Sequence, residues 1–328
     1  MKASRLILSC IAFTLIAALP AVAGPRTFVS GLGNDANPGT REQPKRTFAS
    51  ALAVTDAGGD IVTLDSAGYG SSTLMINKSI SIIAPPGVYA AIRVTASHAI
   101  SISGAADTVV TLRGLTLTGQ GFSTGHGVLF TAGAALHIQN CTISNFFIRG
   151  IECQNIPGVA EVYITDTTVR NGRNNGAAFG AAEGAALKVT IRSSHFLDNH
   201  LDGMIVNARA VAVVSESQSN GNGSNGFEAA FGGTVTVTRS VASENRAAGF
   251  SSHSLGTMNI DHCTASQNEF DGLAELNGPG GLGIMRISNS IVTNNGRNGF
   301  NGAPESLGNN LVRGNAGGDG ASTIVPGL

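Results

Sequence analysis

Apolar and polar residues alternate in short segments along the chain, and these segments recur about every 23 residues from position 127 onward. In each repeat two apolar residues stand two positions apart, for example Val235 and Val237. A glycine followed by an apolar residue comes shortly afterwards, for example Gly249-Phe250. A period of two is typical of β-strands, because successive side chains of a strand point to opposite faces. The pattern therefore predicts short strands joined by turns.

The glycines of these repeats form a column with a spacing of 23 to 27 residues. They are Gly127, Gly150, Gly176, Gly203, Gly226, Gly249, Gly272 and Gly299. A unit of this length cannot bury its own apolar face, whereas stacked units can, because each strand pairs with the equivalent strand of the next coil. The repeat predicts an all-β solenoid in which equivalent side chains lie about 4.8 Å apart.

A column of asparagines lies four residues before the glycines. It comprises Asn199, Asn222, Asn245, Asn268 and Asn295. The two preceding repeats carry Phe146 and Gly172 in the same place. We expect the asparagines to point inward and to bond to one another as a structural ladder at a turn. On this interpretation Asn245→Ala leaves buried amide groups unpaired and costs about 1–3 kcal/mol.

The charge of the chain is low and evenly distributed. Of the 328 residues 12% are charged, and the formal net charge is −1. Scattered Lys and Arg residues argue against a nucleic-acid partner. Cys141, Cys153 and Cys263 fall in small or apolar columns, so we expect small core residues and no disulfide framework. We expect no cofactor, and we expect a monomer.

The first 23 residues have the features of a signal peptide. Lys2 and Arg5 precede an apolar run, and Ala21-Val22-Ala23 fits a cleavage site. This predicts an exported protein, either periplasmic or extracellular. No later segment is long and apolar enough to span a membrane.

The segment after the signal peptide differs from the repeats. Residues 24–70 predict a small α/β cap module with a short helix over residues 47–57, and residues 71–328 predict the solenoid. The sequence FVSGLGNDANPGT, followed by TFASAL and GGDI, resembles the N-terminal cap of bacterial exported right-handed parallel β-helix proteins of the pectate-lyase-like superfamily. The resemblance implies a single-stranded right-handed parallel β-helix. The group is mostly uncharacterised, and the superfamily includes lyases, hydrolases, epimerases and adhesins, so the fold does not determine the activity.

The chain lacks the catalytic motifs that the resemblance implies for enzymes. Polysaccharide lyases need a calcium-binding carboxylate cluster, but Glu152 and Glu228 lie three coils apart, roughly 14 Å, and cannot share an ion. Of the polygalacturonase elements only Gly125-His126-Gly127 is present. Asp198, His200 and Asp202, with His195 nearby, could serve a transition metal. A solvated turn is the more common explanation, and we expect no metal site.

Repeat length varies at one edge only. The step from glycine to the next strand is nine residues in most repeats and twelve or thirteen after Gly150, Gly176 and Gly272. Loops on a rigid scaffold often carry function, although neutral variation is an equal alternative. A ligand site is therefore predicted around residues 154–158, 180–184 and 276–281 or on the adjoining outward face of the strands. The candidate ligand-binding residues are Glu152, Gln154, Asn207, Glu228 and His253.

A second candidate patch comprises Glu216, Arg239, Asp261 and His262. An acid–base pair is conceivable there, but a row of ordinary surface charges is the simpler interpretation. Aromatic platforms for sugars are few, since the chain has no Trp and most Phe residues fall in core columns. The exceptions are Phe122, Phe146, Phe147 and Tyr163.

The favoured interpretation is an exported scaffold that binds a polysaccharide or cell-surface glycan weakly and has no recognisable catalytic site. One alternative is a carbohydrate-active enzyme, either a polysaccharide lyase or a glycoside hydrolase, with a non-standard site. Another alternative is a structural or adhesive surface protein.

Overall fold

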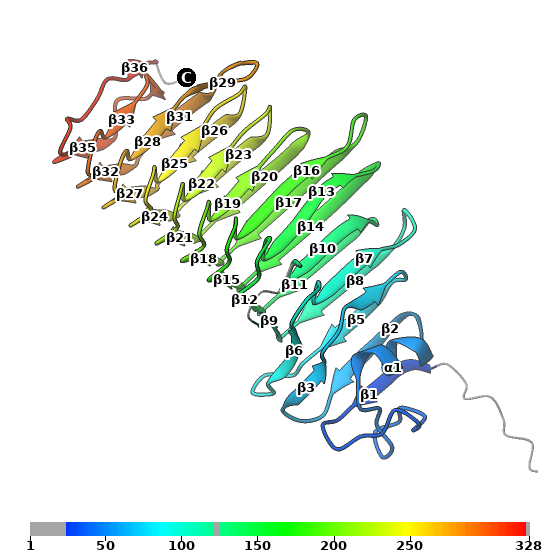
Figure 1. Cartoon of the computed structure of the whole chain (residues 1–328). Coiled ribbons are helices and arrows are strands. Elements are labelled where there is room, and N and C mark those ends of the chain that lie inside the picture. The colour runs from blue at the N-terminus through cyan, green and yellow to red at the C-terminus, as the bar shows by residue number, and fades with distance from the viewer. Residues whose placement is uncertain (1–23, 121–124, 326–328) are drawn as a thin grey trace, which may run out of the picture.

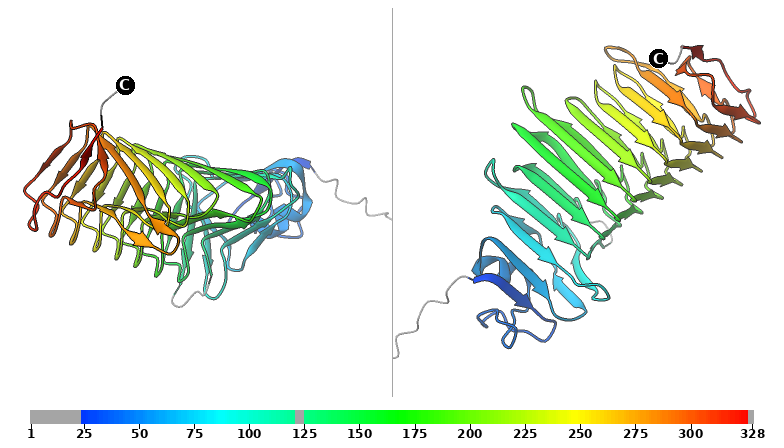
Figure 2. Two further views of the ribbon diagram at one scale, coloured as in Figure 1. Left: turned by 90° about the horizontal axis from the view of Figure 1, so that it is seen from above. Right: turned by 180° about the vertical axis from the view of Figure 1, so that it is seen from behind.

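Three long β-sheets make up the molecule, and each coil of the chain adds one strand to each sheet (Figure 1). The computed structural model describes residues 24–120 and 125–325, so the predicted signal peptide and Phe122 lie outside the described residues. We name the 13-stranded sheet A, the 11-stranded sheet B and the 10-stranded sheet C. The chain visits them in the order C, A, B, and the coils stack along one direction in both views of Figure 2.

Sheet A consists of β1 (Gly24–Val29), β2 (Thr55–Thr63), β5 (Ile80–Ile83), β8 (Val109–Arg113), β11 (Ala135–Gln139), β14 (Val159–Thr165), β17 (Ala186–Arg192), β20 (Ala210–Ser215), β23 (Thr234–Thr238), β26 (Thr257–Asp261), β31 (Ile284–Ser288), β34 (Glu305–Ser306) and β36 (Thr323–Ile324). Sheet B consists of β3 (Ala67–Gly70), β6 (Ala90–Val94), β9 (Leu115–Gly119), β12 (Thr142–Ser144), β15 (Thr168–Arg170), β18 (His195–Leu197), β21 (Gln218–Asn220), β24 (Val241–Ser243), β27 (Thr264–Ser266), β32 (Ile291–Thr293) and β35 (Leu311–Arg313). Sheet C consists of β4 (Leu74–Ile76), β7 (Ile100–Ser103), β10 (Val128–Ala132), β13 (Ile151–Ile156), β16 (Ala177–Ala181), β19 (Met204–Val206), β22 (Phe227–Ala229), β25 (Phe250–Ser252), β28 (Leu273–Glu275) and β33 (Phe300–Asn301). A separate antiparallel hairpin joins β29 (Asn277–Gly278) to β30 (Gly281–Leu282).

The strands within each of the three sheets pair in parallel and in the register that the glycine column predicts. Val128 pairs with Ile151, and Met204 pairs with Phe227. These side chains are fully buried between the sheets, so the predicted solenoid is confirmed. Each such apolar side chain contributes about 1.5–3 kcal/mol through its burial.

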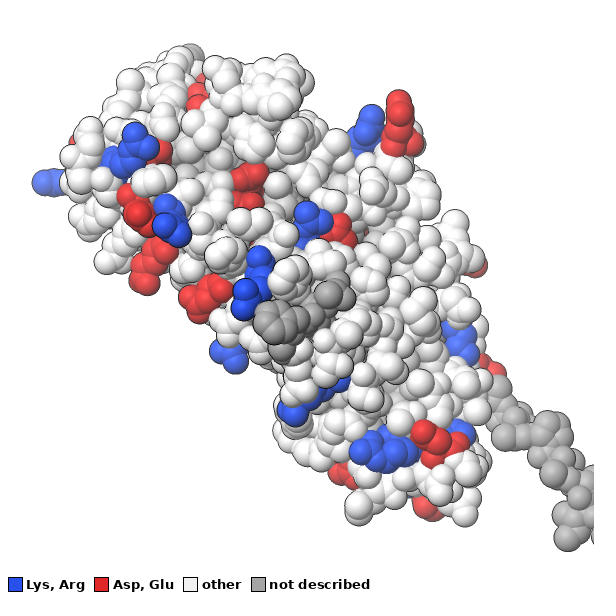
Figure 3. All heavy atoms as spheres, viewed as in Figure 1, with Lys and Arg blue, Asp and Glu red and all other residues white. Residues whose placement is uncertain are grey.

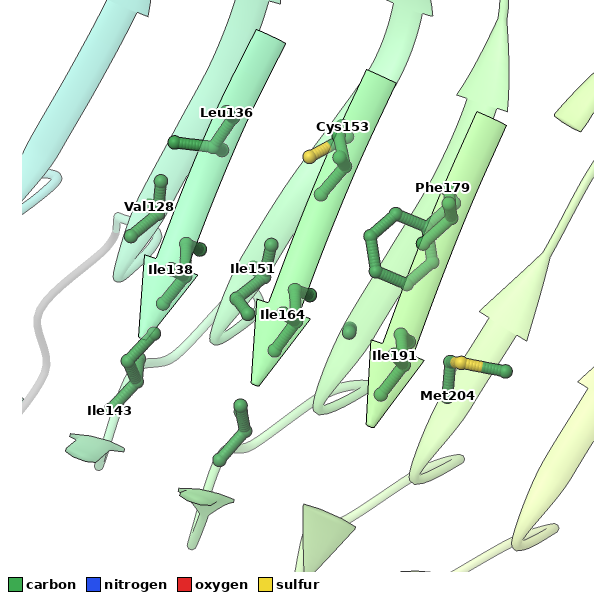
Figure 4. Packing of buried hydrophobic residues seen from close by; sticks show 14 of the residues in the cluster. Val128, Leu136, Ile138, Ile143, Ile151, Cys153, Ile164, Phe179, Ile191 and Met204 are labelled. Carbon is green, nitrogen blue, oxygen red and sulfur yellow. The ribbon is translucent and has the colours of Figure 1, made fainter. Parts of the chain in front are cut away.

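Identical or similar side chains lie over one another in the interior (Figure 4). Ile138, Ile164 and Ile191 form one such row on successive strands of sheet A. Cys153 points into the same core beside Phe179. All three cysteines outside the signal segment are buried and free, as predicted for small core residues.

Two turns of each regular coil contain a residue in the left-handed conformation. In the turn from sheet A to sheet B, the A–B turn, these residues have φ between 45° and 53°. They are Asn140, Asp166, Ser193, Glu216, Arg239, His262 and Asn289. In the turn from sheet B to sheet C, the B–C turn, φ lies between 53° and 67°. Those residues are Asn145, Asn171, Asp198, Gly221, Glu244, Gln267 and Asn294. Asn, Asp and Gly tolerate this conformation best, which explains much of the polar composition of the turns.

The asparagine column lies inside the B–C turns, immediately after the left-handed residues. Nδ2 of Asn222 donates to Oδ1 of Asn245 at 3.0 Å, and Nδ2 of Asn245 donates to Oδ1 of Asn268 at 3.0 Å. Each Oδ1 also accepts a backbone N–H of the preceding coil. The same bonds link Asn199 at one end and Asn295 at the other, and the ladder continues to Asn315.

The N-terminal end of the solenoid is covered by the single described helix, α1 (Phe48–Val54). The side chain of Thr47 caps it, and Phe48 packs on Tyr69 with ring centroids 5.0 Å apart. The helix is shorter than expected because residues from Thr55 onward pair with β1 as strand β2. Residues 24–70 also supply β1, β2 and β3 at the ends of sheets A and B. Within the described part of the chain, no helix has the length and apolarity of a membrane span.

Candidate functional site

The edge at which the chain passes from sheet C to sheet A, here called the C–A edge, is uneven. Strands β13, β14, β16 and β17 have five to seven residues each, and the link from β28 to β31 contains the β29–β30 hairpin; these three projections are here called arms. In the three coils between them the sheet C strands β19, β22 and β25 have only three residues each. These arms project beyond the stacked strands in Figure 1. The edge therefore has a low stretch bordered by arms.

A small surface hollow of about 210 Å³, here called the edge hollow, lies at the foot of two arms. Its lining residues are Gln154, Asn155, Gly180, Ala181, Asn207, Ala208 and Arg209. Gly180 lies between Gln154 and Asn207 in the stack. A Cβ atom on Gly180 would lie 3.4 Å from Cβ of Asn207 and 3.8 Å from Cγ of Gln154. The hollow exists because this one coil has no side chain there.

The polar groups of the edge hollow have few partners within the protein. Oδ1 of Asn207 is buried and has no hydrogen-bond partner. Arg209 takes part in no ion pair among the described residues. Asn155 and Arg209 have φ of 55° and 62°, an uncommon conformation for these residues that often accompanies functional sites. The hollow can therefore accept hydrogen-bonding groups from a ligand.

Glu152 points outward from sheet C, yet only 7% of it is exposed. Nη1 of Arg149 donates to its Oε2, and the same Nη1 lies 3.5 Å from Oε1 of Gln154. Burial raises the pKa of Glu152, and the bond and charge of Arg149 oppose that rise. His126 stacks on His98 beside this pair, with ring centroids 5.1 Å apart. Through Arg149, Glu152 thus helps to position Gln154, which lines the edge hollow.

Glu228 and His253 belong to a second group beside sheet C, here called the acidic cluster (Asp202, Asn225, Glu228 and His253), in which the two carboxylates are buried and the other two side chains are half-buried. Nδ2 of Asn225 donates to Oε2 of Glu228 at 2.5 Å and to Oδ1 of Asp202 at 3.2 Å. Nε2 of His253 lies 3.0 Å from Oε1 of Glu228. Two carboxylates that share one amide nitrogen disfavour simultaneous ionisation.

The electrostatics of the acidic cluster follow from this geometry. The pKa of Asp202 is raised to about 6, chiefly by burial and secondly by the charge of Glu228. The hydrogen bond and charge of Glu228 raise the pKa of His253, against the effect of burial. Asn225 was not among the candidate residues, and Asp202 was considered only as a possible metal ligand, although both occupy the position directly before a column glycine. That shared position was the available sequence signal.

The second candidate patch is assembled, but the fold explains its members. Glu216 pairs with Arg192 at 3.1 Å and with Arg239 at 3.5 Å, and Nδ1 of His262 lies 2.8 Å from Oδ2 of Asp261. Glu216, Arg239 and His262 are each the left-handed residue of an A–B turn. Their side chains are exposed, so these are solvated surface pairs of small energetic weight.

The polar residues of one B–C turn do not form a metal site. Asp198 and His200 are exposed on the turn, whereas Asp202 is buried in the acidic cluster. Over residues 24–120 and 125–325, no three His, Cys, Asp or Glu side chains are placed to hold a metal ion.

Two aromatic residues lie where the sequence did not place them. Phe146 was predicted outside the core but is buried, because the ladder position points inward. Phe231 is 51% exposed in a short C–A connection, with φ of 49°, and its ring centroid lies 5.5 Å from that of His253. An exposed ring therefore stands beside the acidic cluster.

The distribution of surface charge does not mark a further candidate site. On the face shown in Figure 3, acidic and basic side chains form small mixed groups separated by uncharged surface. This distribution agrees with the low charge content of the sequence.

Comparisons with known proteins bear on the fold. A family model described as a right-handed β-helix region matches residues 182–323. The chain has the right-handed parallel β-helix fold of pectate-lyase-like proteins. No match to the sequence was found among curated proteins.

Solved structures agree with this fold at low sequence identity. The β-helix is similar to pectate lyase Pel9A, with 16% identity, a TM-score of 0.59 and coverage of 91% of this chain and 79% of that one. It is also similar to a lacto-N-biosidase from Eubacterium ramulus, with 12% identity, a TM-score of 0.56 and coverage of 92% and 68%. A rhamnogalacturonan lyase has 14% identity, a TM-score of 0.51 and coverage of 92% and 86%. At these identities the likeness concerns the fold alone.

Proposed function

We propose that the protein is an exported, monomeric glycan-binding β-helix whose binding site is the edge hollow and the adjoining outer face of sheet C. The observation that carries the proposal is the cavity at Gly180, which is walled by Gln154 and Asn207 and contains an unpartnered buried carbonyl oxygen. On this proposal residues 1–23 direct export, residues 24–70 cap the solenoid and residues 71–328 carry the site.

The size and chemistry of the edge hollow fit one sugar ring. Its volume of about 210 Å³ is smaller than the roughly 300–1,000 Å³ of pockets for drug-sized ligands. Side-chain amides both donate and accept hydrogen bonds, as sugar hydroxyl groups require. Arg209 adds a cation that has no acidic partner over residues 24–120 and 125–325, which favours a glycan that carries carboxylate groups. Two proteins of similar fold, a pectate lyase and a rhamnogalacturonan lyase, support a polysaccharide ligand.

Binding is expected to be weak, because the face around the hollow has few charges and few exposed aromatic rings. We expect dissociation constants from mM to tens of μM, roughly 4–6 kcal/mol. Phe231 extends the contact along the C–A edge.

Native affinity electrophoresis in gels containing polygalacturonate, rhamnogalacturonan or xylan tests the proposal. The wild-type chain should be retarded by at least one of these polysaccharides, and Gly180→Leu, which fills the hollow, should reduce the retardation about tenfold. Gly68→Leu is the matched control, because its Cβ position is also open but lies at the N-terminal end. Equal retardation of wild type and Gly180→Leu, or no retardation by any of the three, would contradict the proposal.

The acidic cluster favours a second candidate function, acid–base catalysis on a glycan. Asp202 has a pKa near the range in which a carboxyl group can donate a proton at neutral pH. Reducing-end and unsaturated-uronate assays on the same three polysaccharides test this candidate. Turnover by wild type that Glu228→Gln abolishes would support catalysis, and no turnover would exclude these substrates.

A further inference from the structure

We propose that the B–C turns hold a second sugar-binding hollow, here called the turn hollow, and that it takes an uncharged sugar unit of the same glycan. This inference rests on the proposed function. The turn hollow has a volume of about 660 Å³. Its principal side chains are Phe147, Asn171, Arg173, Asp198 and His200.

Three glycines line the turn hollow and add no side chains to it. Gly172 takes a place that asparagines fill from Asn199 onward. Gly221 takes the left-handed place held by Asp198 in the coil before it. Gly223 brings its backbone so close to the preceding coil that a Cβ atom would lie 2.1 Å from the carbonyl oxygen of His200.

The chemistry of the turn hollow suits a sugar ring. Phe147 is 44% exposed and offers an apolar surface, and Arg173 and His200 follow it at the same position of the next two coils. Asn171 and Asp198, which stand two residues before Arg173 and His200, add planar polar groups to the lining. Such a combination of one aromatic surface and a few placed polar groups is typical of small-molecule sites. Because Arg173 and Asp198 carry opposite charges, an uncharged sugar is favoured here, in contrast to the edge hollow with Arg209.

The two hollows flank the same three strands of sheet C. In the turn hollow, the lining residues that precede β13, β16 and β19 are 147, 171–173 and 198–200. The edge hollow is lined by residues that come after the start of the same strands, namely 154–155, 180–181 and 207–209. The outward residue of the middle strand is Ala178, which is small and buried. From residue 200 to residue 207 the chain spans roughly 20 Å at about 3.3 Å per residue. One oligosaccharide that crosses sheet C at these strands can therefore occupy both hollows.

The proposal is tested with the same polysaccharide gels and two further variants. Phe147→Ala and His200→Ala should each reduce retardation about tenfold, a change that corresponds to about 1.4 kcal/mol. His200 is exposed, so its replacement preserves the fold even if Phe147→Ala destabilises it. Phe270→Ala is the matched control. Phe270 is similarly exposed in a B–C turn but lies before β28, where Arg297 covers its ring at 5.2 Å.

The outcomes separate this inference from the proposed function. Loss of retardation in Gly180→Leu alone would support the edge hollow and overturn the turn hollow. Loss in Phe147→Ala and His200→Ala alone would do the reverse. Equal loss in Phe270→Ala would overturn the turn hollow, because it would indicate a general effect of exposed aromatic rings. Absence of retardation for the wild-type chain would overturn both.

Discussion

The B–C turns differ between the two halves of the solenoid. From Asn199 to Asn295 each turn is closed by a side-chain amide that bonds to the coils before and after it, and Asn315 ends the ladder. In the two coils before Asn199 the same position holds Phe146 and Gly172. The turn hollow lies where the two stretches meet, and its lining comes from both of them. Regular stacking therefore stabilises the molecule, and the sites that we propose lie where the repeat changes.

The largest effect is expected for the middle of the ladder. Asn245→Ala removes the acceptor of the Asn222 backbone N–H and the donor to the Ser219 carbonyl oxygen. Each buried group left unpaired costs about 1–3 kcal/mol. Urea unfolding should therefore show a clear loss of stability. Asn294→Gly is the control, because Asn294 is exposed, left-handed and replaced by a residue that prefers that conformation. Similar midpoints for the two variants would contradict a stabilising role of the ladder.

A pair of glycine substitutions sharpens the comparison. A Cβ atom on Gly226 would lie 2.6 Å from the carbonyl oxygen of Gly249, a rigid backbone atom. A Cβ atom on Gly180 would meet nothing closer than 3.4 Å. Gly226→Ala should cost about 1–3 kcal/mol, as overpacking does, whereas Gly180→Ala should leave the unfolding midpoint nearly unchanged. If both substitutions destabilise the chain equally, the edge hollow is not a tolerant site.

How far the sequence predicts the molecule depends on whether a feature repeats. The register of Val128 with Ile151, the inward ladder and the buried cysteines all followed from columns, because each coil must match its neighbour. The edge hollow lies partly within the ranges 154–158 and 180–184 that the variation in repeat length indicated. The turn hollow did not follow from the columns, because its shape depends on side chains of several coils that do not repeat.

Burial of the outward carboxylates also escaped the sequence. Glu152 and Glu228 occupy outward positions, and the repeat placed them correctly on the face of sheet C. Their burial depends on Arg149 and Asn225, which come from the preceding turn and cover them. Phe231 was missed for the opposite reason. It stands two residues after the end of β22, in a left-handed turn, and its ring is exposed to solvent.

The acidic cluster predicts that the free energy of unfolding depends on pH, whereas the uncharged asparagine ladder predicts no such dependence. Asp202 has a pKa of about 6 in the folded chain against an ordinary value of 3.8. A group whose pKa is raised by folding stabilises the fold fully below its ordinary value, and that contribution is lost as pH rises through the folded value. Asp202 therefore makes the free energy of unfolding fall between about pH 4 and pH 6. The raised pKa of His253 acts in the same direction, and its stabilising contribution is lost as pH rises above its ordinary pKa of 6.5.

Asp202→Asn tests this dependence with little change in shape, because Asn175 and Asn225 hold the same position in the neighbouring coils. The difference in unfolding free energy between variant and wild type should shift in favour of the variant as pH rises from 4 to 7. Asp35, Asp65 and Asp261 have lowered pKa values and change the free energy of unfolding in the opposite direction. Because wild type and variant share these residues, their contributions cancel in the difference. A difference that stays constant over this range would show that Asp202 does not titrate there.

The smallest effect is expected at the surface ion pairs, the counterpart of the buried ladder. Hydrogen bonding to Arg192 and the charges of Arg192 and Arg239 lower the pKa of Glu216, yet its carboxylate is exposed to solvent. Water replaces such a pair at little cost, and salt screens it. Glu216→Gln should leave the thermal midpoint unchanged in low and in high salt, whereas Glu216→Val, a β-branched residue at φ of 53°, should lower it. A drop with Gln that disappears in high salt would mean that the exposed charges contribute to stability after all. The contrast between Gln and Val isolates what this position requires, which is the left-handed backbone and not the charge.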